Sequence, residues 1–150
     1  MVVEQGPEWW VKIADFGISK RRHDATTMQT LQRGTMGFAA PEAVGVTSEK
    51  SDGPYSSAVD MWSLGAVTFL MLTGQSAFQN FAELAAYCAG SKKFPAETLE
   101  KLAVSGEGQD FVASLMVLAP EARPAAEKAL QHPWMGAELE HLETANTGSR

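Results

Sequence analysis

The triplet Asp15-Phe16-Gly17 is the first place in the sequence where side-chain types and spacing suggest chemistry. It directly follows residues 9–14, whose large apolar residues and length are typical of a strand. A carboxylate at the end of a strand can point into a nucleotide site and hold the Mg²⁺ ion that bridges phosphate groups. Gly17 allows a sharp backbone turn directly afterwards. A three-residue pattern also arises by chance, so the alternative is a plain turn that closes a strand.

Several longer motifs follow this triplet in a fixed order. Residues 17–40 show no sustained hydrophobic period, and a loop of this length inside a compact domain is usually functional or mobile. The later motifs are Gly34-Thr35-Met36-Gly37-Phe38-Ala39-Ala40-Pro41-Glu42, Asp60-Met61-Trp62-Ser63-Leu64-Gly65, Leu118-Ala119-Pro120-Glu121-Ala122-Arg123-Pro124 and His132-Pro133-Trp134. Motifs of this length in this order are far more specific than the triplet alone.

The elements that must position these motifs are predicted to be mainly α. A helix is predicted over residues 57–73, because Ser57 and Asp60 have capping-box spacing and Gly74 is a helix stop. Since this helix has no polar face, we expect protein to surround it on most sides. Further helices are predicted over 81–89 with Asn80 as cap, over 108–118 and over 124–131. Residues 2–3 and 9–14 predict a short β-hairpin at the N-terminus.

Composition and charge exclude several classes of protein. A net charge of −6 and a pI near 5.0 argue against a nucleic-acid binder, which normally carries a basic surface. The most apolar stretch, residues 59–72, is shorter than the ~20 residues of a membrane span and contains Asp60 and Ser63. No apolar leader follows Met1, so we expect no membrane contact and an intracellular protein, cytoplasmic or nuclear.

Cys88 is the single cysteine, so the sequence has no internal disulfide. We expect it to be a buried apolar thiol on a helix, and a reactive thiol is the less favoured alternative.

In their order and spacing, the motifs resemble the eukaryotic-type serine/threonine protein kinase family from about residue 2 to residue 135. The resemblance implies a mainly α fold, the C-terminal lobe (C-lobe) of a protein kinase, with a short β-hairpin and without the N-terminal lobe. It assigns residues 1–135 to the C-terminal part of the kinase domain and residues 136–150 to a polar tail. It also implies phosphoryl transfer from ATP to a protein substrate, with Mg²⁺ as cofactor, in the complete domain.

The resemblance also implies roles for residues near the triplet. Asp15 is the expected metal ligand, and Phe16 and Gly17 complete the cofactor-binding triplet. Thr35 is expected to contact an aspartate of the catalytic loop, which indicates serine/threonine specificity. Residues Met36, Gly37 and Phe38 are expected to form a floor under the substrate residue that follows the phosphoacceptor. An apolar floor suits an apolar or undemanding side chain there.

Three further residues are expected to be structural: Glu42, Arg123 and Asp60. The resemblance pairs Glu42 with Arg123, and a planar guanidinium suits a buried carboxylate because it binds both oxygens and keeps its charge. The second Ala-Pro-Glu, residues 119–121, directly precedes Arg123-Pro124 and is interpreted as a loop between helices.

The loop between Gly17 and Gly34 contains three candidate phosphorylation sites, Thr26, Thr27 and Thr30. A phosphate on one of them could bind Arg33 or the basic run 20–22 and order the loop. The alternative is that all three are ordinary solvated threonines.

Other parts that phosphoryl transfer requires are absent from these 150 residues: they contain no His-Arg-Asp, no Val-Ala-Ile-Lys and no Gly-x-Gly-x-x-Gly. We therefore expect the residues to be inactive alone and to bind no ATP or Mg²⁺. One explanation is a longer protein whose N-terminal half of the domain is encoded upstream. The alternative is a non-catalytic kinase-like interaction module. Either way, the helix over residues 57–73 would lose part of its cover and expose an apolar patch.

Overall fold

A computed structural model describes residues 2–4, 10–11, 37–46 and 57–136 of the chain. Two short strands come first, and Val2 and Glu4 of one pair antiparallel with Val11 and Trp10 of the other. The mainly α prediction with an N-terminal strand pair is therefore confirmed. In chain order the elements are β1 (Val2–Glu4), β2 (Trp10–Val11), α1 (Ala58–Thr73), α2 (Phe81–Cys88), α3 (Ala96–Lys101), α4 (Gly106–Leu115), the 3-10 helix η3 (Pro120–Ala122) and α5 (Ala126–Leu130).

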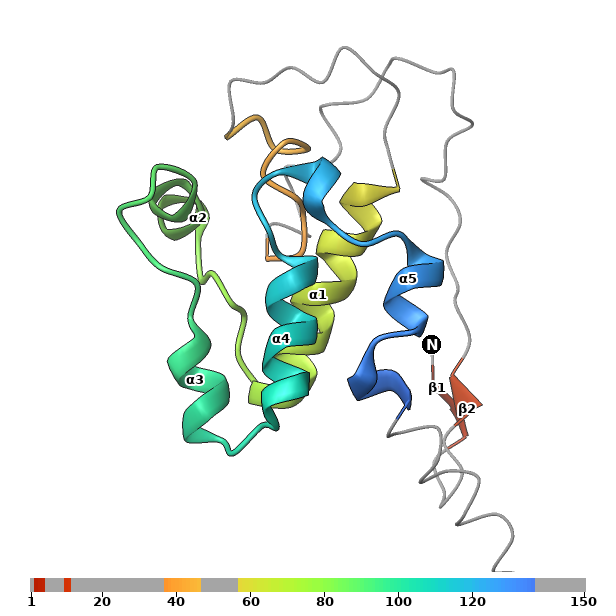
Figure 1. The fold of residues 1–150 in the computed structure, drawn as a ribbon. Helices are drawn as coiled ribbons and strands as arrows, with labels where there is room; N and C mark the ends of the chain where they lie inside the picture. Colours follow the sequence, from red (N-terminus) through yellow and green to blue (C-terminus); the bar gives the residue numbers. More distant parts are fainter. Residues whose placement is uncertain (1, 5–9, 12–36, 47–56, 137–150) are drawn as a thin grey trace, which may run out of the picture.

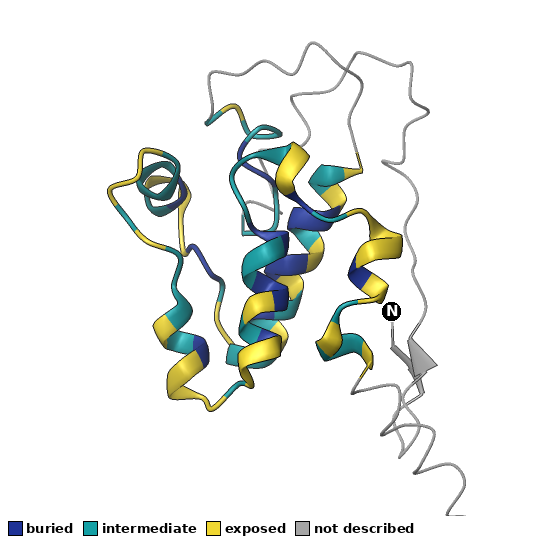
Figure 2. Cartoon of the chain, in the orientation of Figure 1, coloured by how far each residue is buried: buried dark blue, intermediate teal, exposed yellow. Residues whose placement is uncertain are grey.

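Helices α1 and α4 pack side by side and form the centre of the described fold (Figure 1). Trp62 and Phe69 of α1 are fully buried, as are Val112 and Leu115 of α4. Figure 2 shows the buried residues concentrated where these two helices face each other. Helices α2 and α3 lie on one side of this pair and α5 on the other (Figure 1). The core is therefore a helix pair with smaller helices around it.

Gly65 allows the close approach of α1 to α4. A Cβ atom at this position would lie 2.7 Å from Cγ of Met116 and 2.9 Å from Cβ of Leu115. Both distances are shorter than carbon atoms tolerate, and both neighbours are completely buried. The two helices can pack at this distance because residue 65 has no side chain.

Replacing Gly65 by alanine is expected to destabilise the protein. Overpacking a core costs about 1–3 kcal/mol, and the better helix propensity of alanine returns about 1 kcal/mol. We expect a net loss of up to about 2 kcal/mol in the free energy of unfolding, measured by urea denaturation. Gly106→Ala is the matched control, because a Cβ at Gly106 meets no atom within 4 Å. Equal stability of the two variants would contradict this account of the helix contact.

Two of the predicted helix boundaries are confirmed. Gly74 ends α1 in the left-handed conformation, with φ of 71°, and its N–H donates to the carbonyl of Leu70 at 2.8 Å. At the start of α2, Oδ1 of Asn80 accepts from the N–H of Glu83 at 3.0 Å. The Glu83 carboxylate reaches back to the N–H of Gln79 at 2.9 Å. Two free amides at the start of α2 are therefore satisfied by side chains.

The capping box predicted at Ser57 is wrong. Ser57 precedes α1, but its φ and ψ of −56° and −12° are already helical, and its side chain accepts no capping hydrogen bond. A capping residue needs an extended backbone to turn its hydroxyl toward the free amides of the first turn. Only the carbonyl of Ser57 is used, by the N–H groups of Asp60 and Met61, each at 3.1 Å.

The remaining helices differ in part from the prediction. Helix α3 was not predicted, because six residues are too short for a hydrophobic period and only Leu99 among them is buried. Helix α4 begins at Gly106 instead of residue 108, since Oγ of Ser105 accepts from the N–H of Gly108 at 3.1 Å. Helix α5 begins two residues after Pro124 and is shorter than predicted.

One side of α1 is exposed, although protein surrounds the helix on most sides as expected. Leu64, Val67 and Met71 are 44%, 40% and 80% exposed, and their spacing places them on one side of the helix. We call these three residues the exposed stripe of α1. This stripe agrees with the separate expectation that the helix over residues 57–73 exposes an apolar patch. Among the described residues, no helix has the length and apolar character needed to cross a membrane.

Candidate functional site

The guanidinium of Arg123 lies at the centre of the most extensive polar contact in the described fold. Its two terminal nitrogens donate to the two oxygens of Glu42, with Nη1···Oε1 at 2.6 Å and Nη2···Oε2 at 2.9 Å. Nη1 also donates to the carbonyl of Ala58 at 2.9 Å. Nε donates to the carbonyl of Val117 at 2.8 Å, and Nη2 to that of Leu118 at 3.1 Å. These five hydrogen bonds use all five donors that an arginine side chain carries.

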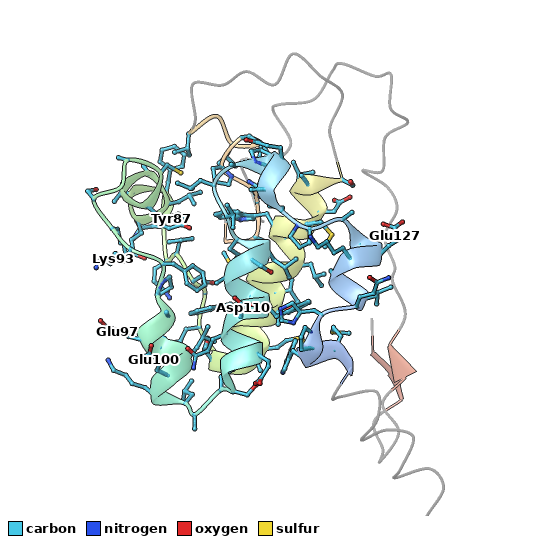
Figure 3. The ribbon with its side chains drawn as sticks, viewed as in Figure 1. Tyr87, Lys93, Glu97, Glu100, Asp110 and Glu127 are labelled. Atoms are coloured by element: carbon cyan, nitrogen blue, oxygen red, sulfur yellow. The ribbon has the colours of Figure 1, made fainter. Side chains whose placement is uncertain are left out.

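The same contacts explain why α4 ends at Leu115 instead of residue 118. The last carbonyls of a helix have no partner within the helix and must find one elsewhere. Tyr87 reaches from α2 and donates its hydroxyl to the carbonyl of Met116 at 3.1 Å (Figure 3). Arg123 binds the next two carbonyls, those of Val117 and Leu118. Three successive carbonyls after α4 are thus satisfied by side chains.

The ion pair between Glu42 and Arg123 is almost completely buried. The side chain of Arg123 is 0% exposed and that of Glu42 is 9% exposed. A buried charge is tolerated only when a partner and hydrogen bonds replace its hydration. The bidentate pair between Glu42 and Arg123 is the one that the family resemblance implies. It fastens the middle of segment 37–46 to the loop between α4 and α5.

Trp62 adds a contact that sequence reasoning missed. The Cζ atom of Arg123 lies 5.1 Å from the centroid of the Trp62 ring, within the range of a cation–π interaction. The sequence motif around Trp62 is recognisable, but its spacing does not indicate that the ring lies against the guanidinium of Arg123.

The predicted substrate floor lies beside the N-terminal half of α1. Phe38 packs partly buried against the core, and its carbonyl accepts from Oγ of Ser63 at 2.9 Å. Gly37 lies against Ser76, whose Oγ would be 3.2 Å from a Cβ at position 37. The third floor residue, Met36, lies outside the described residues.

Most of the other predicted site residues also lie outside the described residues: Asp15, Phe16, Gly17, Thr26, Thr27, Thr30 and Thr35. Asp60 lies in the first turn of α1 and is exposed, where a carboxylate suits the positive end of the helix. Within residues 2–4, 10–11, 37–46 and 57–136, no group of three or more His, Cys, Asp and Glu side chains could hold a metal ion.

Burial shifts two titratable groups on α2. It raises the pKa of the Tyr87 hydroxyl, which therefore keeps the proton that it donates to Met116. It also raises the pKa of the Cys88 thiol, which disfavours the reactive thiolate. Cys88 lies on α2 and is half-buried, whereas a buried thiol is predicted.

His132 packs at the end of α5. Its ring meets that of Phe111 edge-on, with centroids 5.1 Å apart. Nε2 lies 3.1 Å from Oδ2 of Asp110, and Nδ1 accepts from the N–H of Trp134 at 3.3 Å. These contacts fit a structural role for His132, because they join α4 to the turn after α5.

A family model described as "Protein kinase domain" matches residues 1–135 of the chain. The chain belongs to the protein kinase family. Serine/threonine-protein kinases are among its relatives, as the sequence motifs predict, so the chain belongs to the eukaryotic serine/threonine type of this family. The helices described above form the C-lobe of the kinase fold.

Two relatives show how much of a kinase the chain covers. It is 37% identical over 128 residues to serine/threonine-protein kinase cds1 of Schizosaccharomyces pombe, covering 85% of this chain and 28% of the relative. It is 38% identical to calcium/calmodulin-dependent protein kinase cmkA of Emericella nidulans, covering 84% of this chain and 29% of the relative. The chain therefore spans less than a third of the length of these relatives.

A solved structure is similar in both fold and sequence. The crystal structure of the Rad53 kinase domain and SCD2 in complex with AMPPNP matches with a TM-score of 0.53 and 34% identity. The match covers 66% of this chain and 38% of the Rad53 chain. The similarity therefore covers about two thirds of this chain.

Proposed function

We propose that this chain is the substrate-binding part of a kinase domain that transfers the γ-phosphoryl group of ATP to serine or threonine of a protein. The observation that carries the proposal is the contact between Glu42 and Arg123. It holds the end of the segment that begins at Gly34, where the family places the protein substrate. A buried bidentate pair with every donor used supports a segment held in one position.

The residues near the triplet have complementary roles in this proposal. Asp15 would hold Mg²⁺, which when bound neutralises phosphate charge during transfer, with Phe16 and Gly17 completing that site. Thr35 would contact the catalytic-loop aspartate. Phosphorylation of Thr26, Thr27 or Thr30 would order the loop between Asp15 and Thr35 through nearby arginines. The same proposal places the protein inside the cell, where ATP is available.

The 150 residues alone are expected to show no phosphate transfer with Mg-ATP, because they contain no second metal ligand of the family type, no catalytic base and no phosphate clamp. The measurement is incorporation of labelled phosphate into a generic protein substrate. Asp15→Ala in the same residues is the control, and the two proteins are expected to give equal background. Transfer clearly above that control would contradict the proposal.

The full-length protein provides the positive test. Translation of the genomic sequence upstream of Met1 is expected to reveal His-Arg-Asp and, earlier, a strand with the phosphate-binding lysine. Protein expressed with that half is expected to phosphorylate a serine or threonine substrate. An uninterrupted upstream frame without these motifs would count against the enzyme.

A second candidate is a non-catalytic interaction module, for which the exposed stripe of α1 would offer an apolar docking surface. Leu64, Val67 and Met71 form an apolar surface of the kind that protein partners cover. Upstream stop codons, or a transcript that begins at Met1, would favour this module over the enzyme.

A further inference from the structure

We propose that Ser63 is a positioning residue that holds the substrate floor, and so contributes to selecting the substrate residue that follows the phosphoacceptor. The inference rests on the proposed function, because it concerns how a protein substrate is bound. Ser63 was recognised only as part of a sequence motif. Its role follows from its contact with Phe38.

The hydroxyl of Ser63 connects α1 to a segment 25 residues away in sequence. Its Oγ lies 2.9 Å from the carbonyl of Phe38 and 3.1 Å from that of Val59 on the same helix. A serine in a helix ordinarily bonds only to the carbonyl four residues before it. Here the hydroxyl has a second, nearer acceptor, which lies on the floor itself.

The other hydroxyl side chains of α1 show that this contact is not general. Thr68 donates to the carbonyl of Leu64 at 2.8 Å, within the helix. Thr73 donates to Phe69 at 2.8 Å and Gln75 at 3.0 Å, and both acceptors belong to α1 or the turn after it. In the described part of the chain, Ser63 is the one α1 hydroxyl that reaches the floor.

The floor is also held on both sides of Phe38. On one side, Gly37 lies against Ser76, in the turn after α1. On the other, Ala40 and Pro41 are buried and lead directly to Glu42, which is held by Arg123. Between these contacts, Ser63 is the only described residue that donates to the carbonyl of Phe38. Loss of the hydroxyl would therefore leave Phe38 free to shift while the residues on both sides of it stay in place.

The test uses the full-length protein with Ser63→Ala. Two peptides that differ only at the residue after the phosphoacceptor, leucine in one and aspartate in the other, are compared by kcat/KM. We expect the KM for the leucine peptide to rise about three- to tenfold, the effect of one hydrogen bond, and the preference for leucine to shrink. The KM for ATP is expected to stay unchanged, because the described contacts of Ser63 are with the carbonyls of Phe38 and Val59.

Ser114→Ala is the matched control, because the Ser114 hydroxyl also lies on a core helix but bonds only to the nearby carbonyl of Phe111 at 2.8 Å. It is expected to behave as the unmodified protein with both peptides. Amide hydrogen exchange gives a readout independent of activity: exchange in residues 37–40 is expected to be faster in Ser63→Ala and unchanged in Ser114→Ala.

The possible outcomes separate the two proposals. Unchanged peptide preference and unchanged exchange in an active Ser63→Ala protein would overturn the role of Ser63. An equal loss toward ATP and both peptides, with a lower Tm, would show a merely structural role and also overturn it. An unmodified full-length protein that phosphorylates nothing would overturn the proposed function and the substrate role together, while exchange would still show whether Ser63 holds the floor.

Discussion

Replacing Arg123 by alanine is expected to lower the free energy of unfolding by about 3–5 kcal/mol, the cost of leaving one member of a buried ion pair alone. The change removes all five hydrogen bonds of the guanidinium. It leaves the carboxylate of Glu42 and the carbonyls of Val117 and Leu118 without their partner, and it removes the cation over Trp62. Urea denaturation of the protein measures the loss.

Two further variants separate charge from geometry. Glu42→Gln removes the negative charge and keeps the shape, so the buried guanidinium loses its counter-ion, and we expect a loss similar to that of Arg123→Ala. Arg123→Lys keeps the positive charge, but a lysine has three donors on one atom and cannot match both carboxylate oxygens and three separate carbonyls. We expect it to rescue little of the stability.

Glu97→Ala is the control for loss of a carboxylate at the surface. Glu97 projects from α3 into solvent (Figure 3), and its side chain is 86% exposed, 4.0 Å from Nζ of Lys101. Exposed pairs of this kind contribute about 0.3–0.5 kcal/mol. If Arg123→Ala cost no more than Glu97→Ala, the contact at Arg123 would not hold the C-lobe together.

In the full-length protein, Asp15→Asn is expected to reduce phosphoryl transfer by at least about a thousandfold, because the loss of a metal ligand removes several kcal/mol of charge stabilisation in the transition state. Asparagine has the same size as aspartate, so the Tm is expected to change little. The readouts are kcat with a peptide substrate and the Tm of the same preparation.

Asp110→Asn is the matched control for Asp15→Asn. Asp110 is exposed on α4 and contacts His132, far from the triplet in sequence. We expect its activity to remain within about twofold of the unmodified protein, as for most surface substitutions. Full activity of Asp15→Asn would remove Asp15 from the metal site.

Features governed by local rules could be predicted from the sequence. Residues 58–73 form a helix ended by Gly74, because an apolar run followed by glycine has few other local solutions. The side chain of Asn80 caps α2 because its place before an apolar run marks a helix start. The pair between Glu42 and Arg123 was available only through the family resemblance, since the two residues lie 81 positions apart.

Features that depend on tertiary packing could not be predicted. Ser57 has the residue type and spacing of a cap, but its backbone is already helical, and no sequence pattern shows that. The partners of Ser63 and Tyr87 are backbone carbonyls, which every residue carries, so residue type gives no signal for them. The end of α4 likewise depends on donors that come from α2 and from Arg123.

The contacts of Arg123 also bear on the order in which the chain folds. Two of its partners are near in sequence, 5 and 6 residues away, but the other two are 65 and 81 residues away. Closing such long loops costs entropy before any contact is gained, so these bonds form after the local helices. When an interaction forms only after the transition state, it slows unfolding more than it accelerates folding. We therefore expect the contacts of Arg123 to act chiefly on the rate at which the C-lobe opens, and less on the rate at which it forms.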